Sequence, residues 1–399
     1  MIIVGIDIAK RDHQAVIIDE RGAALCKPFA FANSNAGVKK LTDAIAHVAA
    51  DPAEVTVGME ATGHYWLALY SALLPLGFTI HVINPIQTDA MRNATTVRKS
   101  KTDVIDCELI AQTIRFGRFS VTRVAEEDMI ALRQLTRFHF ALVDSVAEVK
   151  LQVIALLDQV FPEYQMLFSD TFGKTSVELL LSYTTPEDIL ALDTDALVEI
   201  LARCSRGRLG LAKAEQVKSA AANSFGVKYG RNAFVFQIRS LLAQIHLVEA
   251  QIDELDAQVA EIYAFLDTRL HTIPGVGPVL AATILAEVGD ISRFGSDPAK
   301  LVAYAGIDPS VKQSGNFIGS RNRMSKRGSP YLRRALWLAA TVAYRHDPTL
   351  AAFYHKKRAE GKAHMTAIGA VARKLTYIVF AILRDNKSYL PSIPPKSIP

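Results

Sequence analysis

Four carboxylates in the first third of the sequence could hold a divalent metal ion. Asp7 lies in an apolar run of strand character, "IIVGIDIAK", and points away from the apolar side chains beside it. Glu60 ends a second such run, "VTVGMEATG". Asp103 and Asp106 stand at i and i+3 in "KTDVIDCELIA", on one face of a helix, where two acids repel each other unless a cation lies between them. Oxygen ligands with net negative charge are what a hard divalent ion such as magnesium requires.

The chemistry that such a site supports is phosphoryl transfer. A pair of magnesium ions roughly 4 Å apart could activate an attacking oxygen and stabilise the leaving oxygen. A simpler interpretation is that Asp103 begins a helix, where the helix dipole favours acids, that Asp106 is solvated and that Glu60 caps a turn. Taken singly, the residues do not decide between the two. Taken together, with Asp7 on a central strand, they favour the metal site.

A second candidate for chemistry is the basic stretch "SGNFIGSRNRMSKRG", residues 314–328. From Pro309 to Arg334 the chain has seven Lys or Arg and no acid. Five of these cations could hold phosphate groups through charge alone: Lys312, Arg321, Arg323, Lys326 and Arg327. Ser314 and Ser320 each neighbour a glycine, and either could be a nucleophile if a base, a metal or cationic surroundings activated it. Composition alone favours phosphate binding over a serine nucleophile, and it does not choose between the two serines.

A third signal is "IPGVGPVLAATILAEVG", in which Gly275 and Gly277 precede an Ala-rich helical stretch. The pattern resembles helix-hairpin-helix modules, whose glycines let backbone N–H groups at a helix start approach a DNA phosphate. A glycine turn between two packed helices gives the same letters. The position favours DNA contact, because residues 269–399 carry 20 Lys or Arg against 7 Asp or Glu, whereas residues 1–268 carry 25 against 33. A net charge of +13 in the last third is typical of a surface that binds a polyanion.

The elements that must position these residues change along the chain. Residues 1–124 alternate strand and helix patterns in the order β-β-β-α-β-α-β-α, which predicts a mixed sheet covered by helices, an α/β ribonuclease-H-like domain. Residues 125–266 are predicted to be helical, with an insertion at 162–231. The predicted coiled-coil seam of this helical middle steps by three and four along Ile238, Leu241, Ile245, Val248, Ile252, Leu255, Val259, Ile262 and Leu266.

The last part of the sequence predicts a helical C-terminal domain over residues 267–385. Within it, Ser329 is placed to cap a helix whose first residue is Pro330. Residues 386–399 contain four prolines and no core pattern, so we expect a loose tail.

Other features exclude several classes of protein. The three cysteines fall in no paired spacing, which predicts neither a disulfide framework nor a zinc site. The longest apolar runs are about half of the roughly 18 residues that a membrane-spanning helix needs. The N-terminus lacks the pattern of a signal peptide. The sequence therefore predicts a cytoplasmic protein that makes no contact with a membrane.

Several motifs together resemble one family. These are "GIDIAK", "MEATGHYW", "NPIQTDAMRNATTVRKSKTDVIDCELIA" and a C-terminal block that runs from "IPGVGPVLAATILAEVGDISRF" to "SGNFIGSRNRMSKRGSPYLRRAL". They look like the DEDD insertion-sequence transposases, the IS-one-ten family, which includes Piv-type DNA invertases and bridge-RNA-guided recombinases. The resemblance covers both ends of the chain. It implies a RuvC-like N-terminal domain, a coiled-coil connector and a C-terminal transposase domain.

The resemblance also implies roles for individual residues. The four DEDD carboxylates would be Asp7, Glu60, Asp103 and Asp106, which bind magnesium, and the serine nucleophile of the family's Ser-Gly motif falls on Ser314. The two domains, from different subunits, would form one composite site, and serine attack on a DNA phosphate would leave a covalent phosphoserine link. The implied partners are double-stranded DNA at the element ends and target, a structured non-coding guide RNA, and further copies of the chain in a homodimer or homotetramer.

Two other functions stay open at this point. One is a RuvC-like, metal-dependent nuclease that cuts branched DNA without a covalent intermediate, in which Ser314 only holds phosphate. The other is a nucleic-acid-binding protein without activity, a decayed copy of a transposase.

Overall fold

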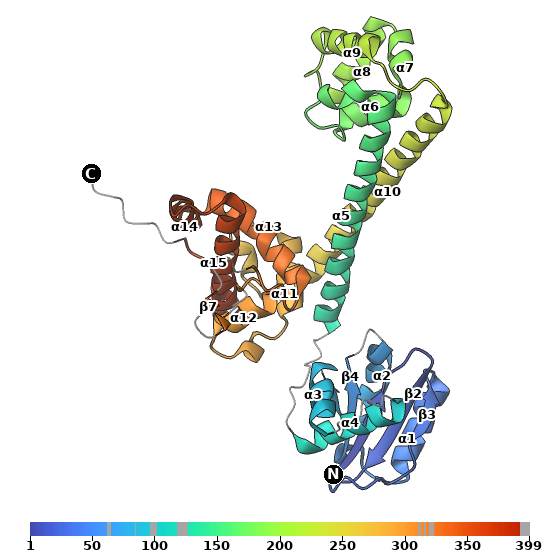
Figure 1. The fold of residues 1–399 in the computed structure, drawn as a ribbon, viewed down its shortest axis with the longest axis vertical. Helices are drawn as coiled ribbons and strands as arrows, with labels where there is room; N and C mark the ends of the chain where they lie inside the picture. Colours follow the sequence, from blue (N-terminus) through green and yellow to red (C-terminus); the bar gives the residue numbers. More distant parts are fainter. Residues whose placement is uncertain are drawn as a thin grey trace, which may run out of the picture. The chain divides into compact units, whose positions relative to one another are not determined.

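The computed structural model describes residues 1–61, 65–83, 85–95, 102–117, 127–309, 313–314, 317–318 and 323–391. The chain divides into two compact units, Met1–Val124 and Ala125–Pro399 (Figure 1). The first unit contains the predicted carboxylates, and the second contains the basic third of the chain.

The first unit is built on a mixed five-stranded sheet in the order β3-β2-β1-β4-β5. The strands are β1 (Ile2–Asp7), β2 (Asp12–Ile18), β3 (Phe29–Ala32), β4 (Val55–Glu60) and β5 (Thr79–Ile83). β1, β2 and β3 pair antiparallel, whereas β4 and β5 run parallel to β1 on its other side. This sheet confirms the predicted α/β architecture and is consistent with a ribonuclease-H-like domain.

The predicted order of elements in this unit omits one helix. The helices are α1 (Asn35–Ala46), α2 (Tyr65–Leu73), α3 (Pro85–Thr95) and α4 (Asp103–Phe116). The sequence pattern passed directly from β5 to α4, because the stretch "PIQTDAMRNAT" of α3 is polar at most positions and lacks a regular apolar stripe. Pro85 occupies the first position of this helix, where its fixed φ is favourable.

Two glycines let α4 lie directly on the sheet (Figure 1). A Cβ atom on Gly5 would lie 2.1 Å from the carbonyl oxygen of Cys107, and one on Gly58 would lie 2.0 Å from Cδ1 of Ile114. Around them, buried residues from the sheet and from α4 form a thin apolar layer: Ile3, Val16, Ile18, Ile83, Cys107, Ile110, Ala111 and Ile114. The opposite face of the sheet packs on α1 and α2 through a separate core.

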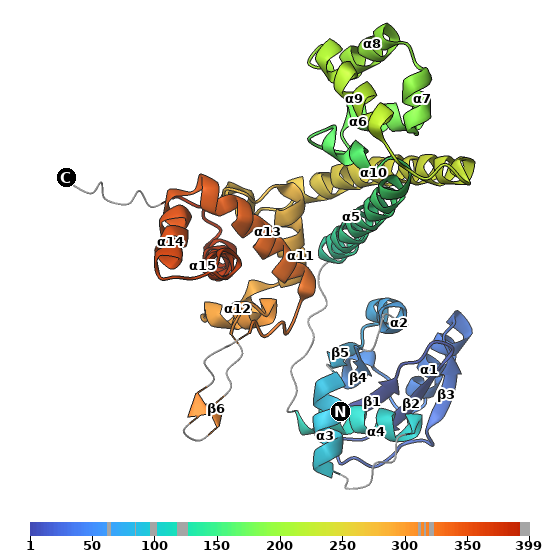
Figure 2. The ribbon, with the colours of Figure 1, turned by 45° about the horizontal axis from the view of Figure 1, so that its top comes forward.

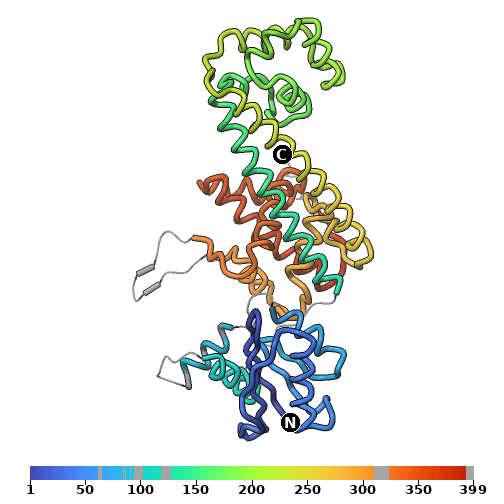
Figure 3. The backbone as a smooth tube through the Cα atoms, turned by 90° about the vertical axis from the view of Figure 1, so that its right-hand side faces the viewer, coloured from blue at the N-terminus to red at the C-terminus, as the bar shows by residue number. Residues whose placement is uncertain are grey.

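The second unit contains two long antiparallel helices, α5 (Glu127–Val160) and α10 (Arg231–Ala264), each of 34 residues. They lie side by side (Figure 1 and Figure 3), joined by the ion pair of Lys150 with Glu249 at 2.8 Å and the contact of His139 with Asp256 at 3.1 Å. All nine residues of the predicted seam are buried or partly buried. The two ends of the helix pair belong to different hydrophobic cores.

One of these cores is that of the tip domain, residues 161–230, which lies between the two long helices in sequence. It contains α6 (Lys174–Ser182), α7 (Pro186–Ala191), α8 (Thr194–Ser205) and α9 (Leu211–Asn223). Fully buried Tyr164, Leu180 and Leu201 pack with the ends of α5 and α10. The predicted helical insertion thus lies at the end of the helix pair and shares one core with it (Figure 1 and Figure 2).

The other core belongs to the C-terminal part of the second unit. Its elements are α11 (Pro278–Val288), α12 (Pro298–Ala305), β6 (Gln313–Ser314), β7 (Phe317–Ile318), α13 (Pro330–His346), α14 (Pro348–Ala359) and α15 (His364–Asp385). The predicted cap is confirmed, since the Ser329 hydroxyl accepts a hydrogen bond from the Leu332 amide at 3.0 Å. The tail is attached where it begins, because the Tyr389 amide donates to Thr272 at 2.8 Å. Residues 392–399 lie outside the described residues.

α15 is long and apolar enough to cross a membrane by length and composition, with a mean hydropathy of 1.6. The sequence prediction judged only its most apolar nine residues and so missed this. In the structure half of its most apolar stretch is buried, and Val371, Leu375 and Val379 pack in the C-terminal core. A core helix of a globular domain accounts for this composition.

We expect Gly5→Ala to destabilise the first unit by about 3 kcal/mol or more, because the added methyl group overlaps backbone that cannot move alone. Urea denaturation followed by circular dichroism measures this. Gly369→Ala is the control, since its Cβ would make ordinary contact with Trp337 at 3.4 Å inside a helix. Equal stability of both variants would contradict this account of how α4 packs.

Candidate active site

Asp7 and Glu60 stand at the ends of neighbouring parallel strands. The register pairs Ile6 of β1 with Met59 of β4, so the two acids are the next residues along each strand. Ile6 and Met59 are buried in the core under α1 and α2. Because side chains alternate along a strand, Asp7 and Glu60 point to the opposite face, which α4 covers.

The third carboxylate comes from α4. Asp106 is 7% exposed. Its position follows from the close packing of α4 on Gly5, which directs the start of the helix to the end of β1. The pKa of the neighbouring Cys107 thiol is raised to about 12, chiefly by burial and further by the charges of Glu108 and Asp7. Asp7 therefore lies within electrostatic reach of α4. The simpler interpretation of Asp106 as a solvated helix residue is wrong.

Asp103 is placed differently from the other three acids. It is exposed in the first turn of α4, directly after Thr102, whose hydroxyl caps the helix by accepting from the Ile105 amide at 3.3 Å. This position is the one that the helix dipole favours for an acid. Asp103 nevertheless lies one turn before Asp106 on the same side of the helix.

Two polar residues of α3 contact these acids, and the sequence prediction missed both. Thr88 donates a hydrogen bond to Glu60, and Arg92, one turn later, donates to Oδ1 of Asp106 at 2.6 Å. Arg92 also lies 3.5 Å from Asp89. The signal was the spacing of Thr88 and Arg92 by four residues, which places both on one face once α3 is known to be a helix.

The carboxylates share one face of the sheet without forming a closed ligand set. Among the described residues, no group of three or more His, Cys, Asp or Glu is close enough to hold a metal ion. The positive charge at Asp106 is supplied by Arg92. Oxygen donors from two strands and one helix, with a buried carboxylate that already binds a cation, suit a site for a hard divalent ion.

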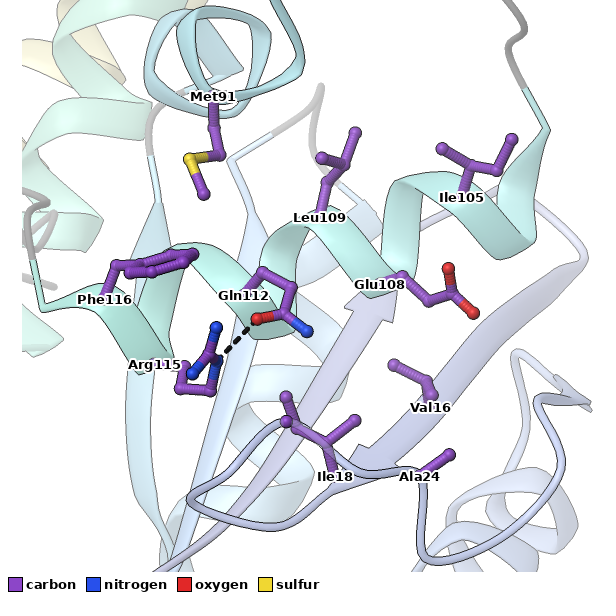
Figure 4. A pocket seen from close by; sticks show the side chains of 11 residues that line it. Val16, Ile18, Ala24, Met91, Ile105, Glu108, Leu109, Gln112, Arg115 and Phe116 are labelled. Atoms are coloured by element: carbon purple, nitrogen blue, oxygen red, sulfur yellow. Dashed lines mark hydrogen bonds between the residues drawn. The ribbon is translucent and has the colours of Figure 1, made fainter. Parts of the chain in front are cut away.

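A pocket of about 590 Å³ lies between β2, Met91 of α3 and α4 (Figure 4). It is lined mainly by apolar side chains such as Ile18, Met91 and Leu109, and in its wall Arg115 donates to Gln112, one turn earlier on α4, at 2.6 Å. Glu108 is the acid among its lining residues. None of the four candidate carboxylates lines this pocket.

Ser314 lies in a short hairpin of the second unit, where β6 pairs with β7 and Ser314 faces Phe317 in the register. Lys312, Ser320 and Arg321 lie outside the described residues. Arg323 and Lys326 are exposed, as phosphate binding requires. Arg327 is paired instead with Asp308 at 2.8 Å, which offsets part of its charge.

The ends of this basic loop are joined by a neck, residues 304–309 with 324–329. Pro309 bridges Met324, the Ser325 amide donates to the Asp308 carbonyl at 2.8 Å and the Ser329 amide donates to the Tyr304 carbonyl at 3.0 Å. Burial alone would raise the pKa of Asp308, but hydrogen bonds from Ser325 and Arg327 outweigh it and lower that pKa. The neck holds the loop at fixed points of the C-terminal core.

The glycine turn before α11 packs between helices, which is one of the two interpretations that the sequence left open, and the DNA contact stays a prediction. Gly275 has a φ of +85°, and a Cβ there would lie 2.9 Å from the Ala343 amide of α13, so packing between helices requires this glycine. Gly277 is exposed and begins α11 without a side-chain cap. The amide groups at this helix start are therefore available to an anion.

A buried ion pair fixes α5 to the C-terminal helices. Glu287 of α11 is 1% exposed and accepts hydrogen bonds from Arg137 of α5 at 2.6 Å and from the Ser329 hydroxyl at 2.7 Å. The hydrogen bond to Glu287 raises the pKa of Arg137. Arg334 adds a two-pronged contact to Asp144 of α5, with both distances 2.7 Å. The basic domain and the long helix are thus one unit.

Comparison with known proteins places both units in one family. The family model for DEDD transposases matches residues 4–162, and the model for the IS116/IS110/IS902 transposase family matches residues 267–355. A protein of insertion element IS116 from Streptomyces clavuligerus is 28% identical over 98% of this chain and 96% of its own length. A protein of IS900 from Mycobacterium paratuberculosis is 27% identical over 97% of each chain, and the pilin gene-inverting protein of Moraxella lacunata is 25% identical over 97% of each.

These matches, over the carboxylate-bearing unit and over the basic helical unit, show an enzyme of the DNA transposase and recombinase class. The chain belongs to the IS116/IS110/IS902 family of transposases, which confirms the resemblance seen in its motifs.

We expect Arg92→Gln to lower the free energy of unfolding by about 3 kcal/mol in buffer without divalent ions, because it leaves the buried Asp106 carboxylate without its cation. Asp89→Asn is the matched control, since Asp89 is the exposed second partner of Arg92, and its loss should change stability by less than about 0.5 kcal/mol. Urea denaturation compares the two. A stable Arg92→Gln protein would show that Asp106 is not held by this contact.

We expect Gly328→Ala to open the neck of the basic loop. Gly328 has a φ of +68°, and its Cβ would lie 1.9 Å from the Tyr304 carbonyl oxygen. Gly361→Ala, at a φ of +78° with no atom within 4 Å, incurs the same backbone strain without the overlap. Stability should fall by about 2 kcal/mol more in the first variant than in the second, and faster trypsin cleavage within 310–327 should accompany it. Identical behaviour of the pair would contradict the packing described for the neck.

Proposed function

We propose that this transposase cuts and rejoins DNA strands through a covalent serine–DNA intermediate, with a metal-binding carboxylate site that assists the transfer. The observation that carries the proposal is the placement of Asp7, Glu60 and Asp106 on the face of the sheet that α4 covers, where Arg92 already provides a cation to Asp106. The matches of both family models, one over the carboxylate domain and one over the serine-bearing domain, support it.

In this proposal Asp7, Glu60, Asp103 and Asp106 hold magnesium, which would polarise the scissile phosphate and stabilise the oxygen charge that develops during transfer. Glu60 is oriented by the hydrogen bond from Thr88. Asp106 is oriented by Arg92, whose charge must be exchanged for that of the metal ion. The exposed position of Asp103 leaves it free to approach the substrate side.

Ser314 is proposed as the nucleophile. Its hydroxyl oxygen forms a bond to phosphorus, the bond from phosphorus to one sugar oxygen breaks, and the proton lost by serine balances the one gained by the departing sugar hydroxyl. Since one phosphoester replaces another, strands can be resealed without an energy-rich cofactor. Lys312, Arg321, Arg323 and Lys326 would neutralise the charge that builds up on the phosphate.

The partners follow from the same proposal. Double-stranded DNA is the substrate, with Gly275 and Gly277 forming a helix-hairpin-helix-like contact to its backbone, and a structured guide RNA selects the element ends and target. The seam between α5 and α10 is proposed to act as the coiled-coil connector of a homodimer or homotetramer in the cytoplasm. The relative from Moraxella lacunata is named for inverting a pilin gene, which supports site-specific rejoining.

Two rivals predict different chemistry. A metal-dependent nuclease would cut DNA without attaching to it. A nucleic-acid-binding protein without activity would bind DNA and leave it intact. The convergence of acids with cationic and hydroxyl partners on one face favours an active site over the inactive alternative.

We expect the parent protein to form a denaturation-resistant adduct with DNA, and Ser314→Ala to abolish both adduct and strand transfer by at least about 100-fold. Ser320→Ala is the matched control, because it removes the other glycine-flanked serine of the same loop and should retain activity. Asp106→Asn should abolish transfer while DNA binding is kept. Denaturing gels with labelled DNA measure all three.

Each rival has its own result in this experiment. Cutting that persists in Ser314→Ala, with no adduct in the parent, would establish the nuclease. A parent protein that binds DNA but transfers no strand at its element ends would establish the inactive copy.

A further inference from the structure

Positive and negative side chains of the tip domain lie in separate segments of its sequence, which its small net charge does not reveal. Residues 178–199 contain six Asp or Glu and no Lys or Arg, whereas residues 203–231 contain seven Lys or Arg and one Glu. The acidic segment covers the second half of α6, all of α7 and the first half of α8, and the basic segment runs from the end of α8 through α9 to the start of α10. The cations of the domain are therefore concentrated in one continuous segment of the chain.

A pocket of about 530 Å³ lies where the basic segment begins, between the turn after α8 and the residues before and at the start of α6. Lys174, Arg206 and Arg208 line it, together with hydroxyl-bearing residues such as Ser169 and Thr175. Asp170 is the acid among its lining residues, and its carboxylate accepts a hydrogen bond from the Phe172 amide at 2.9 Å. The pocket therefore combines three cations with hydroxyl donors.

The three cations have no ionic partner within the domain. All of residues 161–230 are described, and no carboxylate among the described residues lies within 4.0 Å of Lys174, Arg206 or Arg208. Arg208 donates only to the Ser205 carbonyl, at 3.1 Å. Arg206 has a φ of +57°, a left-handed conformation in which glycine or asparagine is the ordinary choice. Three exposed cations line one pocket, and its one acid, Asp170, lies beyond ion-pair distance of all three, which suits a phosphate group.

A second feature of the basic segment points to a nucleic acid as the source of that phosphate. Phe225 is 82% exposed and Tyr229 is 89% exposed, with the exposed Lys228 between them. The chain that carries them is held across the end of α5, because the Val227 amide donates to the Gln159 carbonyl at 2.7 Å. Aromatic rings presented to solvent among cations are the platforms on which unpaired bases stack.

The close approach to α5 also explains the conformation of this segment. A Cβ on Gly226 would lie 1.9 Å from the Val160 carbonyl oxygen, so only glycine lets the chain pass here. The passage fixes Phe225 and Tyr229 on either side of a backbone contact, and both rings stay outside the core. Burial in the tip core, the ordinary reason for an aromatic side chain, does not apply to them.

We propose that the tip domain binds an unpaired stretch of nucleic acid, with a backbone phosphate in the pocket of Lys174, Arg206 and Arg208 and with bases stacked on Phe225 and Tyr229. The proposal rests on the proposed function only in requiring a nucleic-acid substrate. Neither the four carboxylates nor Ser314 takes part in it. The bound strand is an RNA loop or a single DNA strand, and the experiment distinguishes these sources.

The test uses the full-length protein and fluorescence anisotropy with three probes: a 20-nucleotide RNA, the same sequence as single-stranded DNA, and the duplex. The Lys174→Gln/Arg206→Gln/Arg208→Gln variant should bind a single-stranded probe at least about tenfold more weakly and lower the salt slope by about 2. Phe225→Ala/Tyr229→Ala should weaken the same probe by about tenfold. Duplex affinity should stay within about twofold of the parent in both.

Matched controls separate this site from general charge and hydrophobicity. Arg21→Gln/Lys27→Gln/Lys39→Gln removes three exposed cations from the first unit, and Phe138→Ala/Phe265→Ala removes two exposed aromatic rings from α5 and the end of α10. Both should bind all probes as the parent does. Ultraviolet crosslinking of a 4-thiouridine or 4-thiothymidine probe, mapped by mass spectrometry, should mark peptides within 203–231.

The proposal is overturned by either of two results. One is unchanged single-strand binding in both tip variants with crosslinks confined to other regions. The other is an altered oligomeric state in light scattering while binding of every probe is unchanged, which would make the aromatic surface a protein interface. None of these measurements depends on strand-transfer activity. They therefore test the tip domain even if the proposed serine mechanism is wrong.

Discussion

The candidate active site depends on one contact, the packing of α4 on β1 at Gly5. Since glycine has no side chain, the backbone of Cys107 approaches the strand closely enough that even a methyl group would overlap it. That approach sets both the height and the direction of α4. It brings Asp106, which lies on the helix, over the strand ends that carry Asp7 and Glu60. The polar contacts from α3 then hold two of these acids in place.

In the second unit, polar contacts hold the basic C-terminal helices firmly to the long helix α5. The buried Glu287 joins α5, α11 and the start of α13 through Arg137 and Ser329. A buried carboxylate is tolerated there because each of its oxygens meets a donor. The neck at Asp308 then fixes the basic loop to the same core. The tip domain is attached by the other ends of the same two long helices.

Much of the fold could be predicted from the sequence, because it follows from local pattern. The five strands, the cap at Ser329 and the long helices have clear periodicity or capping signals. α3 was missed because the apolar stripe that marks a helix is weak in it. Its polar residues Thr88 and Arg92 contact the acids instead of a core. For the same reason Thr88 and Arg92, which contact the acids, were not recognised.

The partners of the predicted site residues could not be predicted, since they depend on contacts distant in sequence. The pairing of Arg327 with Asp308 spans 19 positions, and that of Arg137 with Glu287 spans 150. Hydrophobic periodicity describes neighbouring residues in the sequence and cannot indicate pairs that are so far apart along the chain. Composition identified the basic region correctly but treated all of its cations alike. Composition also gave no reason to distinguish the acidic segment 178–199 of the tip domain from the basic segment 203–231, because the charges of the two segments nearly cancel.

The central claim is that the face shared by Asp7, Glu60 and Asp106 binds a divalent metal ion. The most direct test is an anomalous difference map from crystals of the protein grown with Mn²⁺ and DNA. The account predicts a peak about 2.0–2.6 Å from oxygens of these three carboxylates, with the Arg92 guanidinium displaced from Asp106. Density for Mn²⁺ elsewhere, with the contact of Arg92 to Asp106 intact, would contradict it.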